Sequence, residues 1–339
     1  MLDLDTRIAV AGAGSIGCYV GGCLALAGRA ISFLARPANE RPLRAHGLRV
    51  TDLEGRDRVL EGADLSVSAD PARAFHDAGL ILVTVKSGAS EEMARLIAAY
   101  APKGAVVLSL QNGIDNAERI RAVARRPVQS GMVPFNVVRT QVGNDAPLHL
   151  HRATEGAVLV EEGVEGLADL LSVEGCAAAA RADMKAVLWG KLLFNLNNAL
   201  VALSGLPLAE ELRDRRWRLI LADQIAEALA AMNRAGIRPA AAAGTLKPDW
   251  LPAALRLPDW LFGLLARRML AIDPAARSSM WDDLERRRPT EIDALQGAVL
   301  RLAVQVGTDA PRTAGVVRLV REAEQAQRGS PGLTPDVFR

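Results

Sequence analysis

A glycine-rich turn between an apolar run and a helical stretch constrains the fold of this chain more than any other feature. The motif Gly12-Ala13-Gly14-Ser15-Ile16-Gly17 follows a predicted strand at Arg7–Ala11 and opens a predicted helix at Ser15–Ala27. In this context the first glycine permits a tight turn, the second lets the backbone approach a pyrophosphate, and the third lets helix and strand pack closely. The helix N-terminus adds N–H groups and a positive dipole. The motif predicts a Rossmann-type dinucleotide site, with a purely structural glycine turn as the alternative.

The rest of the first half alternates short β-rich runs with helical stretches, which is typical of a parallel sheet covered by helices. The expected strands after the first are Ala30–Leu34, Leu80–Val85, Ala105–Leu110 and Val128–Met132, and the further helices are Glu91–Tyr100 and Asp115–Ala124. The alternation in Leu48–Leu60 predicts a small hairpin inserted in this sheet. Leu148–His151 and Ala157–Glu161 are expected to form a β pair.

The second half has a different character. From Asp183 onward alanine, leucine and arginine dominate, and the periodicity is helical almost throughout. We therefore place the domain boundary near residue 180. The predicted fold class is an α/β Rossmann-type N-terminal domain plus an all-α C-terminal domain, covering residues 1–180 and 181–330.

Composition excludes several classes of function. The chain has 41 basic and 39 acidic residues and only 4% aromatic residues, so no charge excess or basic-aromatic stripe points to nucleic acid or to an anionic membrane. Cys18, Cys23 and Cys176 form no CxxC pair and are expected to be reduced thiols of a cytoplasmic protein. The N-terminus lacks the pattern of a signal peptide, and charges and prolines interrupt the apolar stretch Trp250–Ile272. The four scattered histidines predict no metal site.

The end of the second predicted strand bears on the choice of cofactor. An NAD-binding domain normally has an acidic residue about twenty residues past the glycine motif, where it binds the ribose 2′-hydroxyl. This strand ends instead in Ala35-Arg36-Pro37, without an acid in reach. A guanidinium suits a 2′-phosphate, because it binds phosphate through paired donors. Arg36 thus favours NADP(H) over NAD(H), with a solvated surface arginine as the alternative.

Two further strand ends lie at the same predicted edge, where doubly wound sheets bind ligands. One strand ends in Lys86, and another runs into Asn112-Gly113. Asn-Gly is also a common turn, since both residues tolerate unusual backbone dihedrals. Its place after a buried strand leaves a functional and a structural interpretation equally open.

The first helix of the second half carries polar residues on an apolar background. Ala186–Leu203 is apolar almost all round, and Lys191, Asn195 and Asn198 fall at helical spacing on one face. Burial lowers the pKa of a lysine, which equips it to exchange a proton near neutral pH. The alternative is a lysine at the helix edge that extends its ammonium into water.

A second polar stretch occurs at residues 278–293. Thr290, or the proline before it, is expected to open a helix at Glu291–Val306, with Glu291 in the first turn. The charged cluster Asp282–Arg288 is typical of a solvated surface with local ion pairs. Taken alone, Ser279, Glu291 and the spacing between them do not indicate a functional site.

Five segments in this order resemble the ketopantoate reductase (2-dehydropantoate 2-reductase) family. They are GAGSIG at 12–17, VTVKS at 83–87, QNG at 111–113, WGKLLFN at 189–195 and SSMWDDLERRRPTEID at 278–293. The resemblance spans nearly the whole chain. It implies an NADP(H)-binding Rossmann domain and a helical domain for substrate binding and for dimerisation, which would form a homodimer. It also implies reduction of 2-dehydropantoate, a small 2-oxoacid, to (R)-pantoate with NADPH in pantothenate biosynthesis.

The resemblance also implies roles for individual residues. Lys191 matches the lysine that protonates the ketone, and Glu291 matches a glutamate near that lysine and the nicotinamide ribose. The remaining matches are binding residues: Arg36 and Lys86 for cofactor phosphate, Asn112 for cofactor and substrate, Asn195 for substrate, and Ser279 for the substrate carboxylate. The glycine motif, residues 12–17, completes the cofactor set.

Some positions depart from the family pattern. Ala199 stands where the family has a second asparagine, and Asn198 is better placed than Asn197 to replace it. Ala276 stands where an asparagine is often found, and the segment 237–278 is longer than in short family members. Two alternatives therefore stay open: reduction of a different small 2-oxoacid, and a non-catalytic NADP-binding protein.

Overall fold

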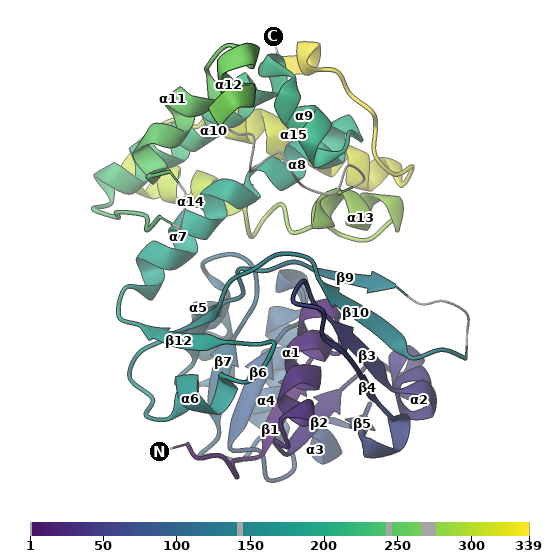
Figure 1. The fold of residues 1–339 in the computed structure, drawn as a ribbon. Coiled ribbons are helices and arrows are strands. Elements are labelled where there is room, and N and C mark those ends of the chain that lie inside the picture. Colours follow the sequence, from purple (N-terminus) through teal and green to yellow (C-terminus); the bar gives the residue numbers. More distant parts are fainter. Residues whose placement is uncertain (1, 141–144, 242–245, 266–275, 339) are drawn as a thin grey trace. The chain divides into compact units, whose positions relative to one another are not determined.

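The computed structural model describes residues 2–140, 145–241, 246–265 and 276–338. The chain divides into two compact units, Met1–Met184 and Lys185–Arg339. Figure 1 shows the sheets of the first unit and the helices of the second.

An eight-stranded sheet forms the centre of the first unit. Its order is β12 (Ala178–Arg181), β11 (Val158–Glu161), β8 (Gln129–Met132), β7 (Val106–Ser109), β6 (Leu80–Val83), β1 (Ile8–Ala11), β2 (Ile31–Leu34) and β5 (Ser66–Ser68). Neighbouring strands are parallel except for the antiparallel pair β8–β11. From β1 the chain proceeds through β2 to β5 and then returns to β6 on the other side of β1. This reversal is the switch point of a doubly wound sheet, so the predicted Rossmann-type fold is confirmed.

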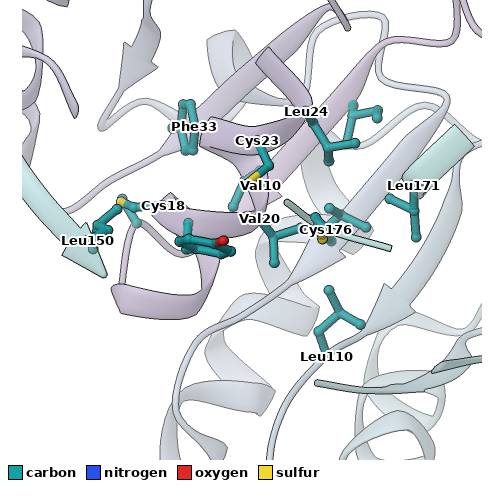
Figure 2. Close-up of a cluster of buried hydrophobic side chains, with 14 of the residues drawn as sticks. Val10, Cys18, Val20, Cys23, Leu24, Phe33, Leu110, Leu150, Leu171 and Cys176 are labelled. Atoms are coloured by element: carbon teal, nitrogen blue, oxygen red, sulfur yellow. The ribbon is translucent and has the colours of Figure 1, made fainter. Parts of the chain in front are cut away.

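Helices cover both faces of this sheet, as the wholly buried strands β1 and β6 require. The helices of the unit are α1 (Ser15–Leu26), α2 (Pro37–His46), α3 (Pro71–Ala74), α4 (Ser90–Tyr100), α5 (Asn116–Ala124) and α6 (Leu167–Leu171). One core packs α1 and α6 against the sheet, and the other packs α3, α4 and α5 against the opposite face. All three cysteines are buried and reduced in the first core (Figure 2). Burial raises the pKa of the Cys23 thiol to about 11 and that of Cys18 to about 12, so both thiols are neutral and unreactive.

A second sheet corrects two of the sequence predictions. The hairpin of β3 (Leu48–Thr51) and β4 (Asp57–Leu60) forms, but it belongs to a separate four-stranded sheet, β4-β3-β10-β9. The strands β10 (Leu148–Arg152) and β11 do not pair with each other, because β10 joins β3 and β9 (Val137–Thr140) while β11 joins the large sheet. Alternation along a strand shows which face is buried but not which partner is bound, and one partner of β10, namely β3, lies about a hundred residues earlier in the sequence.

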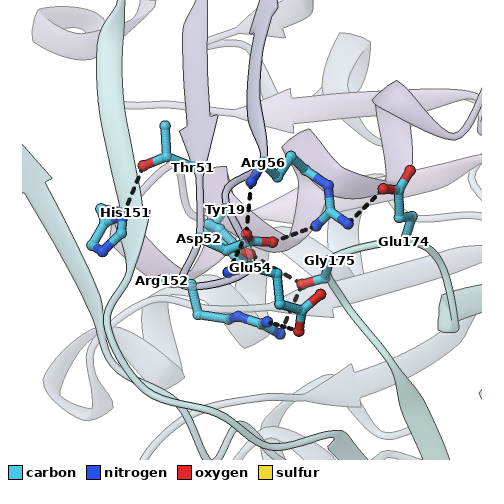
Figure 3. Close-up of polar contacts among 9 residues, drawn as sticks. All are labelled: Tyr19, Thr51, Asp52, Glu54, Arg56, His151, Arg152, Glu174 and Gly175. Carbon is cyan, nitrogen blue, oxygen red and sulfur yellow. Dashed lines mark hydrogen bonds and ion pairs between the residues drawn. The ribbon is translucent and has the colours of Figure 1, made fainter.

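Buried polar contacts attach the second sheet to α1 (Figure 3). Asp52 in the β3–β4 turn accepts a hydrogen bond from Arg56 at 2.6 Å. The guanidinium of Arg152 is buried, and its Nη1 atom donates to the carbonyl oxygen of Gly175 at 3.3 Å. The hydroxyl of Tyr19 in α1 donates to the same oxygen at 3.0 Å. These bonds join α1 and β10 to the loop at residue 175, and an ion pair between Arg56 and Glu174 at 2.8 Å joins the hairpin to the same loop.

The described part of the second unit consists of helices, without a strand. They are α7 (Met184–Asn195), α8 (Asn197–Ser204), α9 (Leu208–Arg213), α10 (Arg215–Arg234), α11 (Leu251–Leu255), α12 (Asp259–Leu265), α13 (Ser279–Glu285), α14 (Gln296–Val306) and α15 (Pro311–Ala326). The long helix α10 packs against α8, α9, α11, α14 and α15. The predicted all-α character of this unit is confirmed.

Two helix predictions in this unit were wrong in detail. The helix expected over Ala186–Leu203 is interrupted at Leu196, which separates α7 from α8. The helix expected from Glu291 begins at Gln296, because the preceding residues form turns. In the described residues, Met184–Ser204 is long and apolar enough to cross a membrane, but 67% of its most apolar window is buried, as in the core helix of a soluble protein. Part of the long segment 237–278, namely residues 242–245 and 266–275, lies outside the described residues.

Candidate active site

The glycine motif forms the turn between β1 and α1. Gly12 has φ +123°, and a Cβ atom there would lie 2.9 Å from the backbone nitrogen of Val85. A Cβ at Gly17 would lie 2.1 Å from the carbonyl oxygen of Gly12. Thr84 holds the turn from the neighbouring strand end, where its hydroxyl donates to Gly12 at 2.7 Å. These glycines are therefore required by the fold itself.

Gly14 is different, because a Cβ atom there would meet nothing within 4 Å. The space at Gly14 is open. Gly14 is the N-cap residue of α1, and no side-chain hydrogen bond caps this end of the helix. The first turn of α1, which includes Ser15 and Ile16, contains no acidic residue. An uncapped helix N-terminus beside open space suits an anionic group such as a pyrophosphate. The motif therefore fits a dinucleotide on grounds that the glycine spacing alone does not provide.

Arg36 lies at the next strand end along the chain. It is exposed, follows β2 and is the N-cap residue of α2. The residue before it, Ala35, is buried, and Pro37 opens the helix. The residues Ala35, Arg36 and Pro37 carry no carboxylate, and the nearest acidic residue along the chain, Glu40, lies in the first turn of α2.

A buried polar network supports the loops after β6 and β7. The predictions from the sequence did not include this network. Gln111 donates from Nε2 to the carbonyl oxygen of Val85 at 2.8 Å and to the hydroxyl of Ser90 at 2.8 Å. Asn116 donates from Nδ2 to the hydroxyl of Ser87 at 3.1 Å. The signal in the sequence was a set of polar residues, Ser87, Ser90, Ser109, Gln111 and Asn116, at positions that the apolar pattern would bury.

This network positions two of the predicted residues. The backbone oxygen of Asn112 accepts hydrogen bonds from Asn116 at 2.6 Å and from Ser87 at 3.1 Å. Gly113, with φ +95°, completes the turn. Lys86 is exposed directly before Ser87 at the end of the neighbouring strand segment. Both residues thus lie at the carboxyl edge of the sheet, where the glycine motif also lies.

In the second unit, the structure brings Lys191 and Glu291 together. Lys191 lies on α7 and is half-buried. Desolvation by burial lowers the pKa of Lys191 to about 8, while the charge of Glu291 acts in the opposite direction. Glu291 lies in the turns before α14, not in a helix as predicted, and its carbonyl oxygen accepts from the backbone nitrogen of Leu295 at 3.1 Å. A lysine with this pKa can hold and release a proton near neutral pH.

The asparagines of this region have different environments. Asn195, one turn after Lys191, and Asn198, on α8, are both half-buried. Asn197 is buried and donates from Nδ2 to Glu211 at 3.0 Å, so its side chain is directed into the core. Ala199 is fully buried. Of the two candidates to replace an asparagine at 199, Asn198 is therefore the accessible one.

Ser279 is exposed on the first turn of α13. The preceding residue, Ser278, donates to the carbonyl oxygen of Asn198 at 2.8 Å and accepts from the backbone nitrogen of Trp281 at 3.1 Å. Ser278 thus caps α13 and joins it to the first turn of α8. This residue was not among the predicted site residues, although it places Ser279 near Asn198. Among the described residues, no group of three or more His, Cys, Asp or Glu side chains could hold a metal ion.

Two family models match almost the whole chain. "Ketopantoate reductase PanE/ApbA" matches residues 8–164, and "Ketopantoate reductase PanE/ApbA C terminal" matches residues 183–324. The chain belongs to the ketopantoate reductase family. The resemblance expected from the sequence motifs is therefore confirmed, and the chain is an oxidoreductase of that family.

Individual relatives agree with the family models. A 2-dehydropantoate 2-reductase from Archaeoglobus fulgidus is 28% identical over 328 residues, which cover 94% of this chain and 98% of that protein. The crystal structure of a PanE/ApbA family ketopantoate reductase from Ralstonia eutropha JMP134 is similar with a TM-score of 0.79 and 29% identity, covering 95% of this chain and 100% of that one. D-mandelate dehydrogenase in a ternary structure with NADH and anilino(oxo)acetate shares the fold, with a TM-score of 0.75, 21% identity, and coverage of 95% of this chain and 99% of that one. The structure of that neighbour contains NADH.

Proposed function

We propose that this protein reduces 2-dehydropantoate to (R)-pantoate with NADPH, the reaction of pantothenate biosynthesis, with Lys191 as the proton donor. The observation that carries the proposal is the half-buried Lys191, whose pKa is lowered and on which the charge of Glu291 acts, in a chain whose relatives bear the name 2-dehydropantoate 2-reductase. We further propose a cytoplasmic homodimer formed through the helical unit.

The cofactor would be held by the first unit. The open space at Gly14 and the uncapped N-terminus of α1 suit the pyrophosphate. Arg36 would bind the 2′-phosphate, and Lys86 would contribute a second positive charge. Asn112, whose backbone is fixed by the buried network, would contact the cofactor and the substrate. When bound, the nicotinamide supplies a hydride to the C2 carbon of the ketone.

The proton would come from the second unit. Lys191 binds the ketone oxygen through its ammonium, stabilises the negative charge that develops there, and transfers a proton from Nζ to that oxygen. Glu291 opposes the effect of burial on the pKa of Lys191 and so keeps a fraction of the lysine charged at neutral pH. One hydride and one proton together convert the ketone into the alcohol, and the lysine is then reprotonated from solvent.

The substrate carboxylate would be bound by Ser279, with Asn195 and Asn198 as further hydrogen-bonding groups. One observation favours a second candidate function, the reduction of a different small 2-oxoacid. Ala199 and Ala276 replace two family asparagines with residues that offer no side-chain hydrogen bond. Loss of such a partner changes substrate preference, because an unpaired buried polar group costs about 1–3 kcal/mol. D-mandelate dehydrogenase, which shares the fold, bears the name of a different 2-hydroxyacid.

The test is NADPH oxidation by the purified protein with 2-dehydropantoate and with a panel of branched and linear 2-oxoacids. We expect 2-dehydropantoate to give the highest kcat/KM, and Lys191→Ala to lower kcat by about 10²- to 10⁴-fold without loss of NADPH binding. Lys185→Ala, which removes an exposed lysine from the same helix, is the matched control and should leave kcat unchanged. A hundredfold preference for another acid would replace the proposed substrate. Binding of NADPH without turnover of any acid would favour the non-catalytic alternative.

A further inference from the structure

The interruption between α7 and α8 has a specific cause. At Leu196 the backbone remains near helical, with φ −59° and ψ −27°, yet the regular helix stops after Asn195 and resumes at Asn197. The side chain of Gln296 donates from Nε2 to the carbonyl oxygen of Leu196 at 2.9 Å. A side chain that bonds a helix carbonyl disturbs the backbone ladder at that point. The break therefore coincides with an inserted glutamine from a helix one hundred residues away.

Gln296 is firmly connected to the segment of Glu291. It is the first residue of α14, directly after the turns that contain Glu291. The backbone nitrogen of Leu295 donates to the carbonyl oxygen of Glu291 at 3.1 Å, and that of Gly297 donates to Ile292 at 2.9 Å. Both residues that flank Gln296 are thus bonded to the turn that contains Glu291.

Leu196, which accepts the bond from Gln296, is connected through the helix backbone to the turn of Lys191. The backbone nitrogen of Leu196 donates to the carbonyl oxygen of Leu192 at 3.0 Å, which continues the helical turn that begins beside Lys191. The amide of Gln296 is therefore a direct link between the helix that carries the ammonium and the turn that carries the carboxylate. Both halves of this link lie in the second unit.

Packing alone does not explain a glutamine at this position. Gln296 is fully buried, and so is Gln224, whose Oε1 atom accepts from the same Nε2 at 3.3 Å. The Oε1 atom of Gln296 and the Nε2 atom of Gln224 have no hydrogen-bond partner among the described residues. Burying an amide that is only partly satisfied is unfavourable compared with an apolar side chain of the same size. Since a glutamine is unfavourable for packing here, we expect its side chain to hold neighbouring backbone segments in position.

We propose that Gln296 is a positioning residue for the reduction, which holds the helix of Lys191 against the turn of Glu291 and so fixes the separation of ammonium and carboxylate. This inference rests on the proposed function for its catalytic consequence, but the positioning itself does not depend on the substrate. Gln296 acts through the backbone of Leu196 and need not touch the reacting groups.

The test compares two variants of buried glutamines. Gln296→Met keeps the length of the side chain but removes the donor to Leu196, whereas Gln224→Met removes only the second acceptor and leaves that bond in place. Glu291 is the charged side chain that acts on Lys191 in the described part of the chain. We therefore expect Gln296→Met to lower the pKa of Lys191, which weakens activity about tenfold more at pH 8 than at pH 6.5. Gln224→Met should leave the pH profile unchanged, because the bond to Leu196 remains.

A direct titration separates this inference from the proposed function. The chain has five lysines, so the side-chain nitrogen of Lys191 can be followed by NMR after ¹⁵N-lysine labelling, with Lys191→Arg to assign it. A lowered pKa in folded Gln296→Met but not in Gln224→Met would support the positioning role, even if 2-dehydropantoate were not the substrate. An unchanged or raised pKa in folded Gln296→Met would overturn it.

Discussion

Lys191 is a residue in which two opposing effects set the useful pH range. Burial lowers its pKa to about 8, and Glu291 limits that decrease. In its proposed role as proton donor, Lys191 must carry its proton, so the donor is present below about pH 8 and is lost as the pH rises through that value. We expect kcat/KM for 2-oxoacid reduction to fall above about pH 8, since this parameter reports groups of the free enzyme.

Glu291→Gln tests the source of this pH range. The variant removes the negative charge that raises the pKa of Lys191, so the decline in kcat/KM should begin at a lower pH than in the wild type. The measurement is kcat/KM from pH 6 to pH 10 for both proteins, with NADPH binding followed in parallel. Coincident pH profiles would show that Glu291 does not act through the charge of Lys191.

Arg36 allows a prediction about cofactor preference. Arg36→Ala removes a cation from the end of β2 without touching the buried core, so the fold should be unaffected. The charge-assisted contact to a 2′-phosphate contributes about 1.5–3 kcal/mol, so NADPH should bind at least tenfold more weakly while NADH binding changes little. The binding of both cofactors is measured by fluorescence titration. The matched control is Arg41→Ala, which removes an exposed arginine from α2, the helix that Arg36 precedes. Equal weakening of both cofactors would remove Arg36 from 2′-phosphate binding.

Residue chemistry was predictable where short motifs carry it, and unpredictable where it depends on distant partners. Lys191 and Glu291 were selected through family segments, and the structure brings the two together. Ser278 and Gln296 were not selected, because their partners lie 80 and 100 residues away. No local pattern distinguishes a serine that caps a helix from one that also binds a second helix.

At the scale of elements, the glycine motif separates folding from binding. A Cβ at Gly17 would lie 2.1 Å from a backbone oxygen, so Gly17→Ala requires the turn to move and should destabilise the first unit by about 1–3 kcal/mol or more. A Cβ at Gly14 meets no atom within 4 Å, so Gly14→Ala should fold normally but obstruct the pyrophosphate. Melting temperatures and NADPH titrations of both variants test this contrast. Normal cofactor affinity in Gly14→Ala would argue for a purely structural glycine turn.

The predicted elements differ from the observed ones in a consistent way. The strands β1, β2, β6, β7 and β8 were predicted within a few residues. The signal is most local in β1 and β6, which are wholly buried apolar runs between helices. The pairing of β10 and β11 was wrong, because each finds a distant partner. The break at Leu196 was missed for the same reason, since the bond from Gln296 is invisible in the helical periodicity. Local pattern therefore predicts the element, and tertiary contacts decide its ends and partners.

At the scale of the whole molecule, the second unit retains a carboxylic acid in its core. Glu211 is fully buried, and its Oε2 atom accepts a hydrogen bond from Asn197 at 3.0 Å. Desolvation by burial raises the pKa of Glu211 to about 8, with the Asn197 bond acting in the opposite direction. Asn197 begins the helix that follows the Leu196 break, so this pair stabilises the side of the break opposite to Lys191.

The buried acid makes the stability of the second unit depend on pH. An unfolded glutamate has a pKa near 4.5 and releases its proton above that pH, whereas folded Glu211 keeps its proton up to about pH 8. Between these values the folded state binds more protons, so stability decreases as the pH rises, by a total on the order of several kcal/mol. Glu211→Gln is neutral at every pH and should lose this dependence. It should therefore gain stability relative to the wild type between pH 5.5 and pH 8.

All five tryptophans lie in residues 185–339, so tryptophan fluorescence during urea unfolding reports this unit selectively. Unfolding is measured at pH 5.5 and at pH 8. The control is Glu210→Gln, which neutralises the exposed neighbouring residue and should have the same free energy of unfolding as the wild type at both pH values. A constant difference in unfolding free energy between wild type and Glu211→Gln across this range would mean that Glu211 is ionised in the folded protein. In that case the buried carboxylate would need a compensating charge, and Arg218, which acts on Glu211 in this sense, would be its source.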